Sequence, residues 1–245
     1  MLTPQASVRR PPDSDTYGQV YVLSYLLMRI VVGAVGFLLP LWVVLVDRFG
    51  FSDPPVRGSL SAYYYTGSRD YFVGLLCTIG VFLVAYKVSE VGLDNTLSFV
   101  AGLAAFCVAW FPTDRPKPNP PQLTLLQAKV GESHVMFVHY GSAILLLFLL
   151  GLMSIVFGTR EGRRAPQPGK RSPSFWRTYH YTCGVLIFAA MVGILIFWKG
   201  FHWDHAMLIG EWISVWAFAA SWLMKGLELD MLKKLLAGAH HPPGW

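Results

Sequence analysis

Two ionisable side chains lie deep inside apolar stretches of this chain, where a charge is costly and therefore points to a function. His139 lies five residues past His134, and Glu211 lies six residues past His205. At a helical rise of about 1.5 Å per residue, each pair places one group at the end of an apolar helix, at the mouth of the predicted helix bundle, and the other roughly 7–9 Å deeper. Such groups bind metal ions, carry protons or bind a polar part of a ligand. Glu211 is the one candidate for a catalytic group.

A metal-assisted hydrolase needs about three His or carboxylate ligands and an activated water. The donors available for such a site, with zinc as the metal, are His134, His139, His205 and Glu211. The sequence contains neither HExxH nor HxxxH, so no familiar metal motif supports them. A proton or cation path would instead use Glu211 as its titrating group. Structural roles stay open as well, because polar side chains often join neighbouring helices in a membrane bundle.

A second set of polar side chains falls at the same predicted mouth and would line a binding pocket there. Hydroxyl, aromatic and charged groups all contribute to it. The pocket candidates are Ser59, Ser61, Tyr63, Tyr64, Arg69, Asp70, Thr113 and His139. The run of tyrosines is also typical of an anchor at the membrane interface.

Six apolar stretches must position these groups, and each is about long enough to cross a bilayer as a helix. They are residues 30–46, 71–86, 95–111, 135–159, 178–198 and 206–224. Together with a hydrophobic fraction of 54%, they predict an all-α polytopic membrane bundle of six transmembrane helices. The predicted parts are a cytoplasmic N-terminal segment with an interfacial lead-in (1–29), the six-helix domain (30–224) and a cytoplasmic amphipathic helical tail (225–245).

The distribution of Lys and Arg predicts the orientation. With the N-terminus inside, cytoplasmic segments hold 12 of these residues and outer segments hold 7, so both termini are predicted in the cytoplasm of a plasma (bacterial inner) membrane. The net charge of +6 then faces anionic lipid, and no motif indicates a nucleic-acid partner. Arg29 is expected to extend to the inner interface. Asp94 and Asn95 are expected to cap the third span.

Several short motifs carry a family resemblance: residues 59–65, 69–74, 94–95, 111–113 and His134. Over residues 59–157 the chain resembles a group of uncharacterised bacterial six-helix membrane proteins and, more loosely, the DRAM-like and Sfk-like membrane proteins of eukaryotes. The resemblance implies six helices and a polar outer vestibule at the motif positions. Alkaline-ceramidase-like intramembrane hydrolases are similar in design, but they have seven helices and a HxxxH pair, which this sequence lacks.

These observations lead to one main functional hypothesis and two alternatives. The main hypothesis is a non-enzymatic integral membrane protein with an outward-facing polar pocket, which handles lipid or assists a larger membrane complex. Its partners would be the lipid bilayer, a lipid ligand or other membrane-protein subunits. If the protein is an enzyme, the first alternative is a metal-dependent lipid hydrolase. The second alternative is a proton-coupled carrier.

Overall fold

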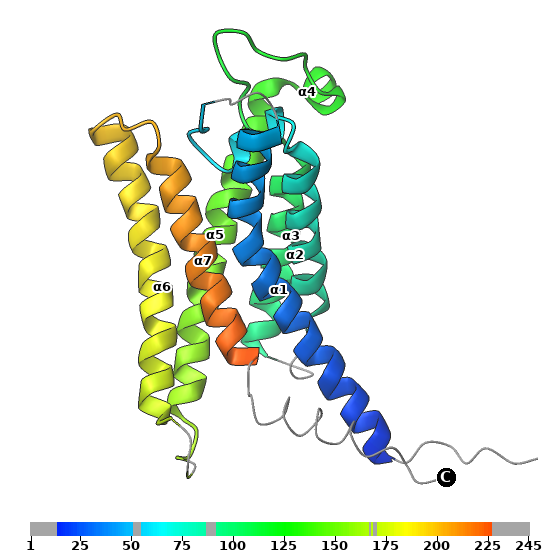
Figure 1. Cartoon of the computed structure of the whole chain (residues 1–245), viewed down its shortest axis with the longest axis vertical. Helices are drawn as coiled ribbons and strands as arrows, with labels where there is room; N and C mark the ends of the chain where they lie inside the picture. The colour runs from blue at the N-terminus through cyan, green and yellow to red at the C-terminus, as the bar shows by residue number, and fades with distance from the viewer. Residues whose placement is uncertain (1–13, 51–54, 87–91, 167, 169–170, 227–245) are drawn as a thin grey trace, which may run out of the picture.

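The computed structural model describes residues 14–50, 55–86, 92–166, 168 and 171–226, and these residues form helices and loops with no strand (Figure 1). The elements in chain order are α1 (Ser14–Gly50), the short 3₁₀ helix η1 (Ser61–Tyr65), α2 (Arg69–Ala85), α3 (Leu93–Trp110), α4 (Leu125–Val130), α5 (Glu132–Gly162), α6 (Pro173–Leu195), the π-helical turn η2 (Ile196–Gly200) and α7 (Ala206–Gly226). The all-α prediction is therefore confirmed for this part of the chain.

Five helical segments of the described chain are long and apolar enough to cross a membrane. They are Leu27–Gly50, Leu93–Trp110, Glu132–Gly162, Pro173–Gly200 and Ala206–Met224. Each coincides with a predicted span. The remaining predicted span, 71–86, is helix α2, which has 17 residues. Most of the predicted amphipathic tail, residues 227–245, lies outside the described residues.

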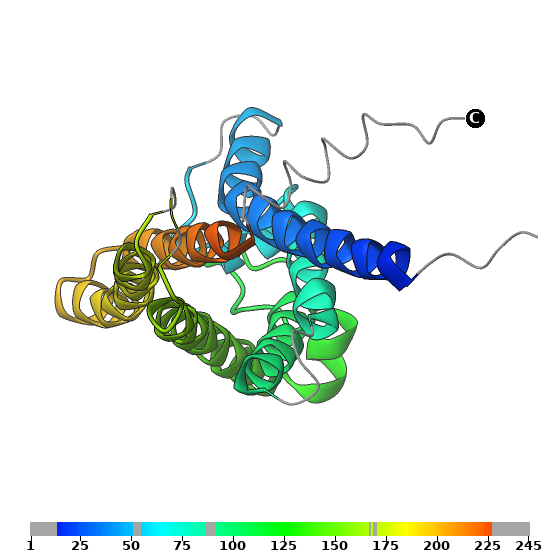
Figure 2. The same cartoon turned by 90° about the horizontal axis from the view of Figure 1, so that it is seen from below.

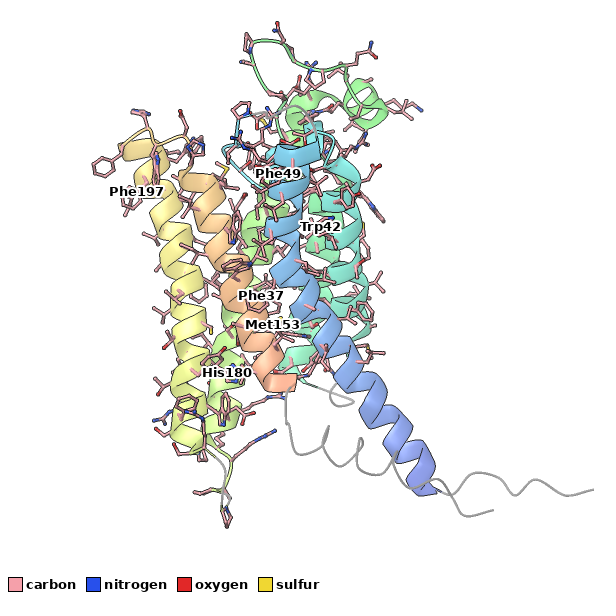
Figure 3. All side chains as sticks on the ribbon, in the orientation of Figure 1. Phe37, Trp42, Phe49, Met153, His180 and Phe197 are labelled. Carbon is pink, nitrogen blue, oxygen red and sulfur yellow. The ribbon has the colours of Figure 1, made fainter. Side chains whose placement is uncertain are left out.

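Five of the long helices form a ring, and α6 lies outside it (Figure 2). Around the ring, α1 packs on α2, α2 on α3, α3 on α5, α5 on α7, and α7 on α1. Helix α6 packs against α5 and α7, and only 17% of its most apolar window is buried, against 39–50% for the other four segments. We call the end that carries η1 and α4 the upper end and the opposite one the lower end. Figure 3 places Phe197 toward the upper end and His180 toward the lower end.

Small residues let neighbouring helices approach closely, which is how helices gain packing energy where lipid replaces water. At the α2–α3 contact, a Cβ added to Gly102 would lie 2.8 Å from the carbonyl oxygen of Gly80 and 2.6 Å from a methyl carbon of Val84. At the α5–α6 contact, a Cβ added to Gly184 would lie 3.0 Å from the carbonyl oxygen of Gly151. Glycine at these positions sets the distance between the two helices of each pair.

The expectation that Arg29 extends to the inner interface is wrong. Its side chain is buried, with 1% of its surface exposed, among the rings of Tyr86, Phe157 and Trp222. The guanidinium carbon lies 5.1–5.6 Å from the three ring centroids, and Nη2 donates a hydrogen bond to the Tyr86 hydroxyl. Because α1 begins at Ser14, Arg29 lies in mid-helix, and three aromatic faces there attract its charge.

The expected cap of α3 is also wrong. The helix begins at Leu93, its N-cap is Gly92, and no side chain caps it. Asp94 instead points into the bundle, where its Oδ2 lies 2.6 Å from Nη1 of Arg160 on α5. A carboxylate in the first turn still favours the positive end of the helix dipole. The residue therefore joins two helices as well as stabilising the start of its own.

Candidate functional site

The ring of helices encloses a cavity beneath η1. Its volume is about 80 Å³. On the same measure a single water molecule needs roughly 10–15 Å³, so the cavity is large enough for several. The cavity extends along four helices, and its lining residues there fall within 32–39 of α1, 72–79 of α2, 139–150 of α5 and 211–218 of α7. At helical rise these stretches run about 10–16 Å along the bundle. The cavity is therefore long and narrow, with room for one extended chain of atoms.

The wall of the cavity is apolar except at its upper end. Three polar residues line it: Ser61 on η1, His139 on α5 and Glu211 on α7. Ser61 belongs to η1 at the upper end, and His139 and Glu211 lie in the upper parts of α5 and α7. The rest of the lining consists of aliphatic residues, two phenylalanines, an alanine and a glycine. The cavity thus has the polarity of an amphiphile, with a polar end and an apolar length.

The segment before η1 closes the cavity from above because α7 binds it at two points. The backbone N–H of Leu60 donates to Oε2 of Glu211 at 2.6 Å, and the N–H of Leu208 donates to the carbonyl oxygen of Gly58 at 2.7 Å. On the other side of η1, the Ser68 hydroxyl donates to the carbonyl oxygen of Val43 on α1 at 2.8 Å. Glu211 is partly exposed, and it lines the cavity.

His139 is buried, with 1% of its surface exposed, and a backbone carbonyl orients its ring. Nδ1 donates to the carbonyl oxygen of Phe111, which follows the last residue of α3, at 2.6 Å. In a neutral ring, a proton on Nδ1 leaves Nε2 as a hydrogen-bond acceptor. The hydroxyl of Tyr140, the next residue on α5, donates to Asp114.

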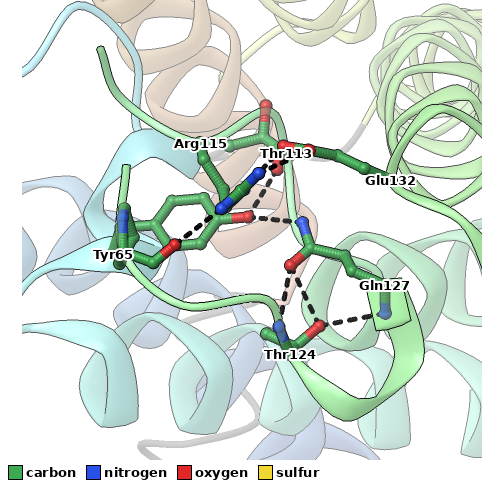
Figure 4. A network of polar contacts seen from close by, with 7 residues as sticks. Tyr65, Thr113, Arg115, Thr124, Gln127 and Glu132 are labelled. Atoms are coloured by element: carbon green, nitrogen blue, oxygen red, sulfur yellow. Dashed lines mark hydrogen bonds and ion pairs between the residues drawn. The ribbon is translucent and has the colours of Figure 1, made fainter. Parts of the chain in front are cut away.

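A hydrogen-bond network joins η1 to the loop and short helix that follow α3 (Figure 4). The Tyr65 hydroxyl donates to the carbonyl oxygen of Thr113 at 2.7 Å and accepts from Nε2 of Gln127 at 2.8 Å. Thr124 and Gln127 form a capping box that begins α4. Burial raises the pKa of Tyr65 to about 12, although the bond from Gln127 lowers it. The hydroxyl therefore keeps its proton, and the network stays intact, at neutral pH.

An ion pair holds the far end of the same loop. Nε and Nη2 of Arg115 each donate to the carboxylate of Glu132, at the start of α5, at 2.8 Å. This pairing with Glu132 raises the pKa of Arg115 above its already high usual value. Nη1 of the same side chain donates to the carbonyl oxygen of Pro121 at 2.8 Å. The upper end of the ring thus carries an ordered cover rather than a loose loop.

The pocket candidates divide into lining and supporting residues. Ser61 and His139 line the cavity, and Ser59 shares a hydrogen bond of 3.3 Å with Ser61. The others do not line it. The Thr113 hydroxyl forms hydrogen bonds with Asp114 and Tyr140. The Tyr63 hydroxyl accepts a hydrogen bond from the backbone N–H of Arg57, and Arg69 donates one to the Tyr64 hydroxyl. Asp70 is exposed.

The predicted metal ligands do not form one site. Among the described residues, no three His, Cys, Asp or Glu side chains are grouped so that they could hold a metal ion. His134 is exposed and His205 is partly exposed, whereas His139 and Glu211 line the cavity. The four candidate donors are therefore not gathered around one point, because helical depth was matched along the chain while the faces on which the side chains lie were not.

Sequence reasoning missed the support of the site and its apolar wall. Tyr140, Gln127 and the backbone of Leu60 contact or support the predicted groups but were not named. One signal was present: Gly36 and Ala143 are small residues inside apolar spans, and both line the cavity. Comparisons with protein-family models, with curated proteins and with solved structures find no match to this chain. The family resemblance over residues 59–157 stays a prediction.

Proposed function

We propose that this protein binds an amphiphile, a lipid or lipid-like molecule, in the cavity of its helical ring. The observation that carries the proposal is the polarity of the cavity: apolar along its length, with Ser61, His139 and Glu211 at one end. An apolar chain would replace the empty space along the wall, and a polar head would meet the three polar side chains. This geometry favours the lipid-handling form of the main hypothesis over a purely accessory role.

The geometry gives less support to the two alternatives. A metal-dependent hydrolase needs donors gathered around one ion, and the described residues contain no such group. A proton-coupled carrier needs polar groups that continue across the membrane. Below Glu211 and His139, the cavity lining is apolar.

We also propose that the ring and α6 together make six transmembrane helices, with the upper end outside a plasma membrane and both termini in the cytoplasm. Helix α2 has 17 residues and is about 25 Å long, close to the roughly 30 Å hydrocarbon core, and it packs against α1 and α3. The arginines near the lower turn between α5 and α6 support this orientation. They are Arg160, Arg163, Arg164, Arg171 and Arg177.

Filling the cavity tests the amphiphile proposal. Ala143 lines the cavity, and Ala143→Phe would place a ring inside it. Gly141→Leu is the matched control, because Gly141 is exposed on the same helix and nothing lies within 4 Å of where its Cβ would be. We expect the filled variant to retain about tenfold less co-purified amphiphile than wild type, by mass spectrometry of the extracted lipids, and the control to retain as much.

Leu147→Trp repeats the test at another depth, and size-exclusion chromatography checks that each variant stays monodisperse. Equal lipid content in wild type and both filled variants would refute the proposal.

A further inference from the structure

The charge of the cavity restricts the head group that it accepts. Its lining contains one carboxyl group, Glu211, and no lysine or arginine. The nearby arginines of the upper end are engaged elsewhere: Arg57 with Asp47 at 3.7 Å, Arg115 with Glu132, and Arg69 with the hydroxyl and ring of Tyr64. An anionic head would therefore meet a carboxyl group without a compensating cation, which is unfavourable in an apolar site.

Two hydrogen-bond donors at the polar end are already used by the protein. The N–H of Leu60 donates to Glu211, and the Nδ1–H of His139 donates to a backbone carbonyl. The Ser59 and Ser61 hydroxyls share a hydrogen bond in which either oxygen can donate. The acceptors left for a ligand are Oε1 of Glu211, Nε2 of a neutral His139 and a lone pair of Ser61. A head group rich in donors fits this set.

We propose that the ligand is a single-chain amphiphile with a primary ammonium head, and that Glu211 selects it. This inference rests on the proposed function of the cavity. An ammonium group has three N–H donors, and the polar end offers acceptors on Glu211, His139 and Ser61 to receive them. A charge-assisted bond to a carboxylate is stronger than a neutral one, so the amine should bind more tightly than an alcohol of the same chain. The narrow cavity admits one chain and excludes lipids that would bury two.

The test compares three ligands that differ only in the head group: decylamine, decanol and decanoate. Each is titrated into the full-length protein in nanodiscs at pH 7.5, and binding is measured by native mass spectrometry. We expect wild type to bind decylamine about tenfold or more tightly than decanoate, with decanol between them. Glu211→Gln should weaken decylamine about tenfold and leave decanol nearly unchanged. Asp70→Asn removes an exposed carboxylate at the same end of the bundle and should change neither.

The outcomes separate this inference from the function on which it rests. If all three ligands bind and Ala143→Phe abolishes binding, but wild type shows no preference for the amine or prefers decanoate, the amine inference is wrong and the cavity function stands. If no ligand binds, or if Ala143→Phe binds as well as wild type, the cavity function fails. Ser61→Ala, which removes one acceptor and little volume, should weaken decylamine by a smaller factor than Glu211→Gln, and it tests head selection independently of any folding defect in the latter.

Discussion

Tyr65 shows how one buried hydroxyl orders the upper end of the bundle. Its pKa is raised by burial to about 12, above the value near 10 of an exposed tyrosine. Because the folded pKa is the higher one, the neutral phenol stabilises the fold: this contribution is complete below about pH 10 and is lost as the pH rises through 12. Tyr65→Phe removes two hydrogen bonds and should cost about 1–2 kcal/mol at pH 8.

The same variant should lose less additional stability than wild type between pH 10 and 12, measured by thermal unfolding followed through tryptophan fluorescence. Tyr71→Phe, at an exposed position on α2, is the control and should follow the wild-type profile. Parallel profiles for wild type and Tyr65→Phe would contradict the role assigned to the hydroxyl.

The ion pair between Asp94 and Arg160 is a polar contact that joins α3 to α5 near the lower end. Asp94 is buried and Arg160 is 39% exposed, so solvent screens one partner. A double-mutant cycle with Asp94→Asn and Arg160→Gln should therefore give a coupling of about 1–2 kcal/mol, between surface and buried pairs. The pair Glu161 and Arg164, 3.4 Å apart at the end of α5, also has one buried and one exposed partner, but it joins residues only three apart and should give below about 0.5 kcal/mol. Equal couplings would mean that linking two helices adds nothing to the coupling.

At the scale of elements, the α2–α3 contact depends on the missing side chain of Gly102. A Cβ there would lie within 3 Å of Val84 and of the Gly80 backbone, so Gly102→Ala must separate the two helices and should cost about 1–3 kcal/mol. Gly74→Ala is the control on α2: nothing lies within 4 Å of its Cβ position, and helix propensity predicts a gain of about 0.5–1 kcal/mol. Thermal unfolding in one detergent measures both. Similar changes in stability for Gly102→Ala and Gly74→Ala would show that the α2–α3 contact does not depend on the missing side chain of Gly102.

The elements themselves were largely predictable from the sequence, whereas their contacts were not. Except at the start of α1, which begins sixteen residues before the predicted span, hydropathy placed each long helix within about five residues, since an apolar run of transmembrane length has one stable form in lipid. The start of α3 was misplaced because Asp94 has a tertiary partner, Arg160, that lies 66 residues away in sequence. Arg29 was misplaced because the three rings that bury it come from outside its own helix.

At the scale of the whole molecule, the candidate site was predicted in part. Ser61, His139 and Glu211 were named from their types and depth, and they line one cavity. The cavity itself was not predicted, because it depends on the order of helices around the ring, and spans that are apolar nearly all round carry little information about their neighbours. For the same reason the exposed His134 was grouped with buried residues on the basis of depth alone.

The orientation of the ring decides from which side the polar end of the cavity receives its ligand. Two exposed residues lie at opposite ends of the bundle: Asn119 in the loop between α3 and α4 at the upper end, and Ala165 at the lower end. Each is replaced by cysteine in a background without the native thiols of Cys77, Cys107 and Cys183. With arginines gathered at the lower turn, we expect an impermeant thiol reagent to label Asn119→Cys on intact cells and to label Ala165→Cys only after permeabilisation. The reverse pattern would place Glu211 near the cytoplasmic face, and the ligand would then enter from that side.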